Sequence, residues 1–290
     1  MDIVKAIGNV DFEITYNCNL RCLHCYNPEP SGEDNLKLER ILEIISEVKR
    51  TGFEELHVTG GEPCEHQNFT EIISHANDSG MRILLETNAT NLPIHTLKKL
   101  KMVTVRASIE GPEQTHNVIR RTKEMNAYRT SVENLVSAKE SGIPVQVTTS
   151  VNKINHNKLY QMVFGLANLG LTDIRLRLSM PASYAEYHWA ILKLSRDDYQ
   201  EVQRQIAQIK QDFPHISFNS ETLDRKKPSI APKFFIDPVG IVKPYPFIEH
   251  YVGDLRTDSV EEVLEKIKTV RYPEAEEQKL CAYLDELQKR

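Results

Sequence analysis

A unit that repeats six times over the first 180 residues constrains the fold most strongly. Each unit is a short apolar segment typical of a strand followed by a stretch with the apolar spacing of a helix. The six strand-like segments are 10–16, 56–58, 82–85, 102–108, 145–150 and 174–178. Several of the helical stretches stop at a glycine, namely Gly52, Gly80, Gly142 and Gly170. Alternating strands and helices favour a parallel sheet with right-handed crossovers, and six units are too few for a closed eight-stranded barrel. The sequence therefore predicts an α/β fold, a partial (β/α)6 TIM-like barrel, with functional groups at the carboxyl ends of its strands.

The alternation of strand-like and helical segments ends after about Ser179. A polar helix is expected at 197–210, a loop at 224–232, a small hairpin at 234–245 and a capped helix at 258–268. We therefore predict two domains, a barrel core at 1–195 and a small C-terminal α+β lobe at 196–290.

Composition narrows the class of protein. The net charge of −5 gives no electrostatic reason to expect a nucleic acid or an anionic membrane surface as partner. The chain begins without the pattern of a secretory signal and has no apolar stretch long enough to cross a bilayer, so a cytoplasmic location is expected. Five cysteines are too few for a disulfide scaffold in 290 residues, and three of them fall within eight positions. In a reducing compartment such crowding indicates metal chemistry.

The three crowded cysteines follow the first predicted strand as Cys18, Cys22 and Cys25. Iron–sulfur clusters are usually held by four thiolates, so three thiolates leave one iron open for another ligand. The alternatives are incidental buried cysteines or a zinc site completed by His24 or a distant residue. Zinc sites usually combine two short ligand pairs, and no second pair is visible. We therefore expect a [4Fe–4S] cluster with one open iron.

A second motif, GGEP at 60–63, follows the second predicted strand. Gly60 and Gly61 let the backbone approach a ligand closely, and Glu62 offers a carboxylate to an ammonium group. The alternative is an ordinary turn at a strand end.

The two motifs together, CxxxCxxC and GGEP, resemble the radical S-adenosylmethionine (SAM) superfamily, and the wider pattern resembles its branch with C-terminal SPASM or "twitch" domains. The resemblance implies that the three cysteines bind a [4Fe–4S] cluster whose fourth iron takes the amino and carboxylate groups of SAM. It also implies that His24, just before the last cysteine, packs near the adenine; the alternative is an exposed loop histidine. The segment 86–90, ETNAT, is similar to a strand end of the family in which the asparagine, here Asn88, helps to frame the cofactor. A polar turn is the alternative for Asn88.

The segment 108–120 resembles the SIDGxxxxHDxxR stretch of the same branch. The resemblance implies that Ser108 and Arg120 contact the carboxylate and ribose end of SAM, and a guanidinium facing a carboxylate is a sound chemical pairing. Two departures stand out. Glu110 replaces the usual Asp, and Arg121 occupies a position where glycine is common, which leaves open which arginine faces SAM. A surface salt bridge is the alternative for either arginine.

The C-terminal lobe follows the outline of a SPASM core without its cysteines. Tyr245 stands where the family has a cysteine, and Cys281 is the one thiol downstream. One thiol cannot hold a cluster, so we expect a single [4Fe–4S] cluster in the chain. The remaining thiol, Cys64, is either a reactive group facing the SAM pocket or a small buried hydrophobe.

The resemblance implies that an electron from flavodoxin or ferredoxin drives reductive cleavage of SAM. The resulting 5′-deoxyadenosyl radical abstracts a hydrogen atom from the substrate. The expected substrate is a ribosomally made peptide, and the alternative is a small metabolite such as a sugar, nucleoside or cofactor precursor. A non-catalytic iron–sulfur or metal-binding protein is the competing class, but it would have no use for GGEP together with Ser108 and Arg120. The sequence assigns no catalytic acid or base.

Overall fold

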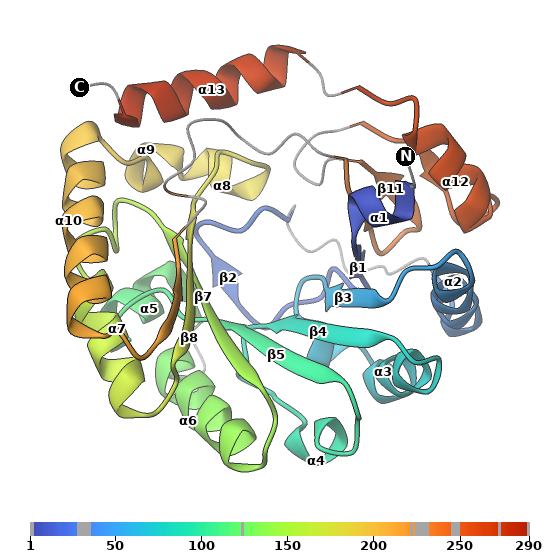
Figure 1. Cartoon of the computed structure of the whole chain (residues 1–290), viewed down its shortest axis with the longest axis horizontal. Coiled ribbons are helices and arrows are strands. Elements are labelled where there is room, and N and C mark those ends of the chain that lie inside the picture. Colours follow the sequence, from blue (N-terminus) through green and yellow to red (C-terminus); the bar gives the residue numbers. More distant parts are fainter. Residues whose placement is uncertain are drawn as a thin grey trace.

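Six parallel strands form the centre of the computed structural model, which describes residues 3–27, 36–122, 125–220, 223, 232–244, 250–271 and 274–288, with the backbone alone at 274–280. The strands pair in the order β1 (Val10–Glu13), β3 (Glu55–Thr59), β4 (Arg82–Thr87), β5 (Val103–Ser108), β7 (Val145–Val151) and β8 (Asp173–Leu178). In the sheet formed by the described residues β1 and β8 are not neighbours, so the barrel is open (Figure 1). The predicted α/β partial barrel is confirmed.

Helices cover the outside of this sheet. They are α2 (Leu38–Arg50), α3 (Phe69–Asp78), α4 (Ile94–Leu97), α5 (Glu113–Ile119), α6 (Ala127–Glu140) and α7 (Leu159–Asn168). The four predicted glycine stops follow α2, α3, α6 and α7, and each has a positive φ between 74° and 100°. A residue with a Cβ is strained in this conformation, which explains why the helices end at glycine.

The strands bury apolar residues on the helix side and turn polar residues to the inside of the barrel. On β8, Ile174 and Leu176 belong to the main core, whereas Arg175 and Arg177 alternate with them. On β5 the buried Arg106 reaches Glu86 of β4 from the same inner side. The inside of a closed TIM barrel is usually filled by branched apolar side chains. In this chain it is a polar space.

The rest of the chain extends both sides of the sheet. On one side β9 (Ser217–Asn219) pairs with β8. On the other side β10 (Phe234–Ile236) pairs with β1 and is followed by the antiparallel strands β11 (Ile241–Lys243) and β12 (Gly253–Asp254). The short elements are α1 (Ile3–Ile7), β2 (Arg21–Cys22), a 3-10 turn η1 (Pro63–Glu65), β6 (Arg120–Arg121), α8 (Tyr184–Tyr187) and α9 (Trp189–Leu192).

Three longer helices complete the fold: α10 (Arg196–Asp212), α12 (Val260–Ile267) and α13 (Glu274–Gln288). The polar helix, the hairpin and the capped helix predicted for this region are confirmed as α10, β10–β11 and α12. Tyr245, and all but the last residue of the loop predicted at 224–232, lie outside the described residues.

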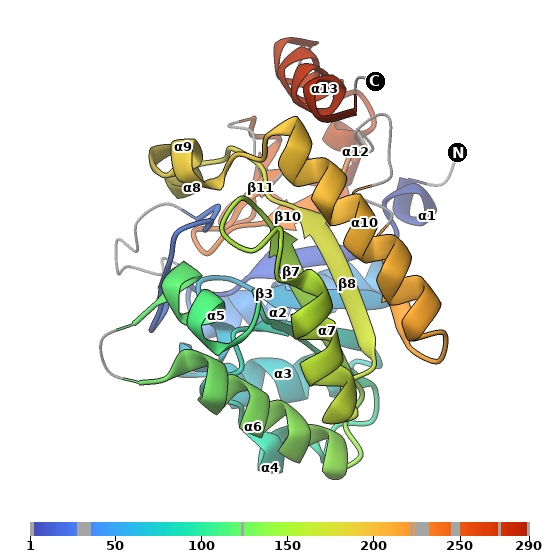
Figure 2. The same cartoon turned by 90° about the vertical axis from the view of Figure 1, so that its left-hand side faces the viewer.

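Helix α10 lies beside α7 on the barrel wall (Figure 2). The first helix of the predicted second domain therefore packs on the predicted first, and the division at residue 195 stays a prediction. None of the described helices is long and apolar enough to cross a membrane.

Phe12 tests the core that carries β1. Its side chain is fully buried between the sheet and the helices, and replacing a buried phenylalanine by alanine removes both apolar burial and packing. We expect Phe12→Ala to lower the free energy of unfolding in urea by about 3–5 kcal/mol. The matched control is Phe164→Ala on α7, whose side chain is 50% exposed and should cost no more than about 1.5 kcal/mol. Equal losses in the two variants would contradict the described core.

Candidate functional site

The three predicted cluster ligands lie together in the loop after β1. Cys22 is buried, Cys18 and Cys25 are half-buried, and all three are free thiols. They pack with Leu20 and Ala127 in an apolar cluster that is separate from the main core.

Burial controls the ionisation of these thiols. It raises the pKa of Cys18 and Cys22 to about 12 and that of Cys25 to about 11. The guanidinium of Arg120 lowers each pKa, and the neighbouring cysteines raise them further. The site can therefore hold three thiolates together only when further positive charge compensates them, as bound iron does.

The donor set suits a cluster better than a single ion. No three His, Cys, Asp or Glu side chains within the described ranges are placed to hold one metal ion, so the zinc alternative gains no support there. In a cubane each thiolate binds a different iron and the three need not converge. Cys64 packs instead against the main core, with its Sγ 4.0 Å from Thr87 Oγ1. Burial raises the pKa of Cys64 well above its usual value, so it remains a thiol. Cys281 is half-buried on α13.

The glycines of GGEP pack against the segment that leads into the cysteine loop. Gly61 N donates to Thr15 O at 2.7 Å, and Glu62 N donates to Asn17 O at 2.7 Å. A Cβ on Gly60 would lie 2.5 Å from Thr15 O, and one on Gly61 would overlap Asn17 O. Gly60 also has a φ of 147°, which a residue with a Cβ rarely adopts. The two glycines therefore let the ends of β1 and β3 approach closely.

The carboxylate of Glu62 joins the ends of β3 and β4. Its Oε1 accepts hydrogen bonds from Thr87 Oγ1 at 2.6 Å and from Cys64 N at 3.2 Å, and its Oε2 accepts one from Asn88 N at 2.7 Å. Burial raises the pKa of Glu62, although these hydrogen bonds oppose the rise. The group that was predicted to meet an ammonium is thus also an anchor for the backbone of the site.

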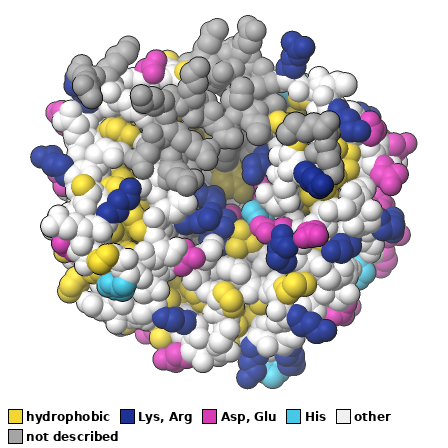
Figure 3. Space-filling model, in the orientation of Figure 1, with side chains coloured by type: hydrophobic (Ala, Val, Ile, Leu, Met, Phe, Trp, Pro, Cys, Tyr) yellow, Lys and Arg dark blue, Asp and Glu magenta, His cyan; other side chains and the backbone are white. Residues whose placement is uncertain are grey.

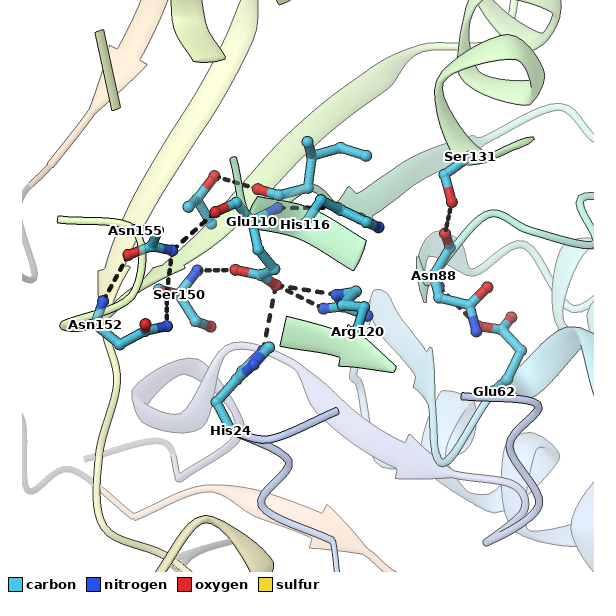
Figure 4. Close-up of polar contacts among 12 residues, drawn as sticks. His24, Glu62, Asn88, Glu110, His116, Arg120, Ser131, Ser150, Asn152 and Asn155 are labelled. Atoms are coloured by element: carbon cyan, nitrogen blue, oxygen red, sulfur yellow. Dashed lines mark hydrogen bonds and ion pairs between the residues drawn. The ribbon is translucent and has the colours of Figure 1, made fainter. Parts of the chain in front are cut away.

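Asn88 connects the cysteine loop to β4. Its Nδ2 donates to Asn19 Oδ1 at 2.8 Å, and its Oδ1 accepts from Thr90 Oγ1 at 2.6 Å. Its carbonyl accepts from Ser131 Oγ at 2.7 Å (Figure 4). The next residue, Ala89, has a φ of 58°, so the chain turns sharply directly after Asn88.

Glu110 is the centre of the second half of the site (Figure 4). Its Oε1 accepts from Arg120 Nε at 3.1 Å and Nη2 at 2.8 Å, and it lies 3.2 Å from His24 Nε2. Its Oε2 accepts from Ser150 N at 2.9 Å, at the end of β7. One carboxylate thus links β5, β7, the cysteine loop and β6.

The charges around Glu110 are strongly coupled. Burial raises the pKa of its carboxyl, but His24 and Arg120 outweigh burial and hold it well below its usual range. Burial lowers the pKa of Arg120, but Cys22 and Glu110 outweigh it and raise the pKa. His116, whose Nδ1 accepts from Glu110 N, has its pKa lowered to about 3 by burial and by Arg120, so its ring is neutral.

The structure distinguishes the two adjacent arginines. Strand β6 pairs antiparallel with β2, so that Cys22 faces Arg120 and Arg21 faces Arg121. Arg120 is nearly buried, with 11% of its side chain exposed, whereas Arg121 is exposed. Arg120 is therefore the arginine at the cysteines.

Buried polar atoms without partners mark the space around these residues. Ser108 lies half-buried at the end of β5, next to Thr148 of β7. Thr148 Oγ1, Ser179 Oγ and His24 Nδ1 are buried and have no hydrogen-bond partner in the part of the chain described. Unsatisfied buried groups are rare in folded proteins and indicate a ligand or ordered water.

A second carboxylate, Glu13 at the end of β1, also lies near the cysteines. It accepts a hydrogen bond from Tyr26 Oη at 2.9 Å. Burial raises its pKa to about 7, although Tyr26 and Asn27 oppose this. A buried carboxyl with a raised pKa beside the cysteine loop is a candidate proton donor or acceptor.

The structure thus gathers the residues that were predicted to hold the cluster and to bind SAM at one end of the barrel. It adds Asn19 within the cysteine motif, Thr87 within the segment 86–90, and Ser150, none of which the sequence analysis had singled out. It also adds Glu13, which no pattern marked. Glu110 was visible in the sequence only as a departure from a family pattern, and nothing in its neighbours predicted a central role.

Comparison with known proteins identifies a family. A family model of the radical SAM superfamily matches residues 12–163, more than half of the chain. The Fe-coproporphyrin III synthase of Methanosarcina barkeri is 30% identical over 50% of this chain and 37% of its own length. The PqqA peptide cyclase of Bradyrhizobium diazoefficiens is 28% identical over 62% of this chain and 47% of its own. The chain therefore spans less than half the length of these two relatives. A probable GTP 3′,8-cyclase of Saccharolobus solfataricus is 24% identical over 83% of this chain and 76% of its own.

Two solved structures share the fold. SuiB of Streptococcus suis, bound to the precursor peptide SuiA, aligns with a TM-score of 0.74 over 96% of this chain and 70% of its own, at 12% identity. The structure of anSMEcpe with bound AdoMet and a Cp18Cys peptide aligns with a TM-score of 0.73 over 97% and 90%, at 16% identity. At this identity the likeness concerns the fold alone.

Gly61 tests the contact that positions the cysteine loop. Because a methyl group there would overlap the backbone of Asn17, we expect Gly61→Ala to destabilise the protein by about 1–3 kcal/mol and to lower the iron content after anaerobic reconstitution. Gly165→Ala on α7 is the matched control, since its Cβ would meet no atom within 4 Å, and it should raise stability by about 0.5–1 kcal/mol. Normal iron binding by Gly61→Ala would show that the contact is dispensable.

Glu110 tests the buried charge network. Glu110→Gln leaves Arg120 buried without its carboxylate, and we expect a loss of about 3–5 kcal/mol in the free energy of unfolding. Glu110→Asp keeps the charge and should lose clearly less. Because folding lowers the pKa of Glu110, its contribution is complete above the ordinary carboxyl pKa of about 4.3 and declines as the pH falls below it. Urea titrations at several pH values should therefore show a smaller loss on acidification in Glu110→Gln than in the unchanged protein. A parallel pH dependence in the two proteins would refute this account.

Proposed function

Because this chain belongs to the radical SAM superfamily, we propose that Cys18, Cys22 and Cys25 hold one [4Fe–4S] cluster and that the adjoining pocket binds SAM. The observation that carries the proposal is the shared apolar cluster of the three thiols opposite Arg120. In this family the two groups together supply a 5′-deoxyadenosyl radical when flavodoxin or ferredoxin provides an electron. We propose that this radical abstracts a hydrogen atom from a substrate.

Arg120 is the proposed partner of the SAM carboxylate. Its Nε and Nη2 are bound to Glu110, which fixes the plane of the guanidinium. No hydrogen bond to a described residue engages its Nη1, so this nitrogen can donate to an anionic group. Ser108 and His24 lie on the same side and are proposed to complete the pocket. We propose that the cofactor also contacts the backbone at the ends of β3 and β4. This backbone is held in place by Gly60, Gly61, Glu62 and Asn88.

A short segment shields the cysteine loop. Ala185 N of α8 donates to Cys25 O at 2.9 Å, and Leu23 packs with Ala185 and Leu192 in a small apolar cluster. A cover of this kind keeps water away from a reactive intermediate. We propose that the α8–α9 segment protects the radical.

A ribosomally made peptide is the first candidate substrate. Two relatives have names that refer to the processing of a peptide. They are the PqqA peptide cyclase and the sporulation killing factor maturation protein SkfB of Bacillus subtilis. The lobe contributes Cys281 as its one thiol, so we propose a single cluster and a reaction that needs no second one.

A small metabolite is the second candidate substrate. The polar inside of the barrel favours it, because such a space suits a compact polar molecule better than apolar side chains of a peptide. The GTP 3′,8-cyclase relatives, which match 83% of this chain, are consistent with this alternative.

Cluster reconstitution tests the proposed reaction. After anaerobic loading with iron and sulfide, dithionite and SAM should yield 5′-deoxyadenosine, measured by liquid chromatography. Cys22→Ala should abolish this product because it removes a ligand, whereas Cys281→Ala and Cys64→Ala should retain it. If the unchanged protein forms no 5′-deoxyadenosine, the proposed enzyme activity is refuted. An iron content of about eight per chain would exclude a single cluster.

Deuterium transfer tests the substrate class. Candidate peptides include any that is encoded by a gene next to the gene of this protein. If the substrate is such a peptide, its deuterated form should transfer deuterium to 5′-deoxyadenosine. Transfer from a deuterated nucleotide or sugar instead would favour the metabolite.

A further inference from the structure

A cavity lies at the end of the barrel opposite the cysteines. Its volume is about 570 Å³, and it is bounded by the first residues of β4, β5 and β7 and the turns before β5 and β7. None of the residues that line it belongs to the cysteine site. We call it the basal cavity.

The lining of the basal cavity is strongly unbalanced in charge. It includes five basic residues and one acidic residue, which are Arg82, Lys98, Lys101, Arg106, Arg175 and Glu55. The chain as a whole carries a net charge of −5, so this concentration of positive charge runs against the average of the molecule. Figure 3 shows basic, acidic and histidine side chains gathered around a hollow near the middle of the barrel.

Arg106 is the most deeply buried of these cations. It is 6% exposed, and its Nη1 donates to Glu86 Oε1 at 2.8 Å while its Nε donates to Gln146 Oε1 at 3.1 Å. Burial lowers its pKa, Glu86 opposes this, and the nearby Arg177 and Arg175 lower it further. The guanidinium groups of Arg177 and Arg175 therefore share the surroundings of the Arg106–Glu86 pair.

Arg175 has no counter-ion among the described residues. It is half-buried on β8, and no hydrogen bond or ion pair joins it to any described residue. Glu86, the carboxylate that pairs with Arg106, also lies 3.8 Å from Arg177. The guanidinium of Arg175 is therefore available to donate hydrogen bonds to an anionic ligand in the cavity.

We propose that the basal cavity binds a small polyanion, a molecule with at least two phosphate or carboxylate groups, through Arg106 and Arg175. Guanidinium groups bind phosphate and carboxylate with paired hydrogen bonds, and several cations around one cavity select for multiple negative charge. The volume lies in the range of small-molecule sites and is too small for a folded partner or a nucleic acid duplex. This site goes beyond the proposed SAM chemistry and does not depend on it.

Calorimetric titration at low ionic strength tests the proposal, with pyrophosphate and citrate as separate probes. At least one probe should bind the unchanged protein, and the preferred one tells phosphate from carboxylate chemistry. Arg175→Gln removes the cation without a counter-ion and should weaken binding at least tenfold. The matched control is Arg204→Gln on the outer side of α10, which is 74% exposed and paired with Glu201, and it should bind like the unchanged protein.

Circular dichroism and thermal unfolding of both variants show whether they are folded. If Arg175→Gln is unfolded, Gln146→Ala on the cavity wall takes its place, and it should weaken binding by releasing the Arg106 guanidinium. The proposal is overturned if neither probe binds the unchanged protein at millimolar concentration, or if the cavity variants bind as well as Arg204→Gln.

Discussion

One buried carboxylate, Glu110, holds the second half of the site together. It is fully buried at the end of β5, and it binds Arg120, His24 and the backbone of Ser150. A buried carboxylate is tolerated only when its charge and its lone pairs are satisfied, so these partners have to occupy their positions for the chain to fold. Because Arg120 faces Cys22 across a two-stranded ladder, the same constraint sets the position of the cysteine loop.

Buried charges are paired at one end of the barrel, whereas a guanidinium lacks a described partner at the other end. At the carboxyl end Arg120 is paired with Glu110. Glu62 is satisfied by hydrogen bonds from Cys64 N of η1, Thr87 Oγ1 of β4 and Asn88 N just after β4. At the amino end Arg175 has no such partner among the described residues. Both arrangements follow from strands that alternate between an apolar outer face and a polar inner face, because the inner residues then line an open space. A core of branched apolar residues, as in a closed barrel, would leave room for neither site.

Local patterns in the sequence predicted the strands, the helix stops and the cysteine motif, because each depends on neighbouring residues. The alternation of Ile174 and Leu176 with Arg175 also signals one polar face of a strand. It cannot tell that Arg106, 69 positions earlier, projects into the same cavity, because that depends on the pairing order of the sheet. The role of Glu110 was hidden for the same reason, since Ser150 and His24 are brought to it by tertiary folding.

The ionisation of the thiols and the separation of the two apolar clusters together determine the order of folding and cluster binding. Burial keeps the pKa of Cys18, Cys22 and Cys25 at about 11 to 12, so each thiol carries its proton at neutral pH until iron displaces it. These thiols pack in their own apolar cluster, whereas the barrel strands and helices share a larger one that includes no part of the motif. Most buried apolar contacts of the described barrel therefore lie outside the cysteine motif. In this respect it differs from zinc fingers, in which the binding energy of the metal is the folding energy.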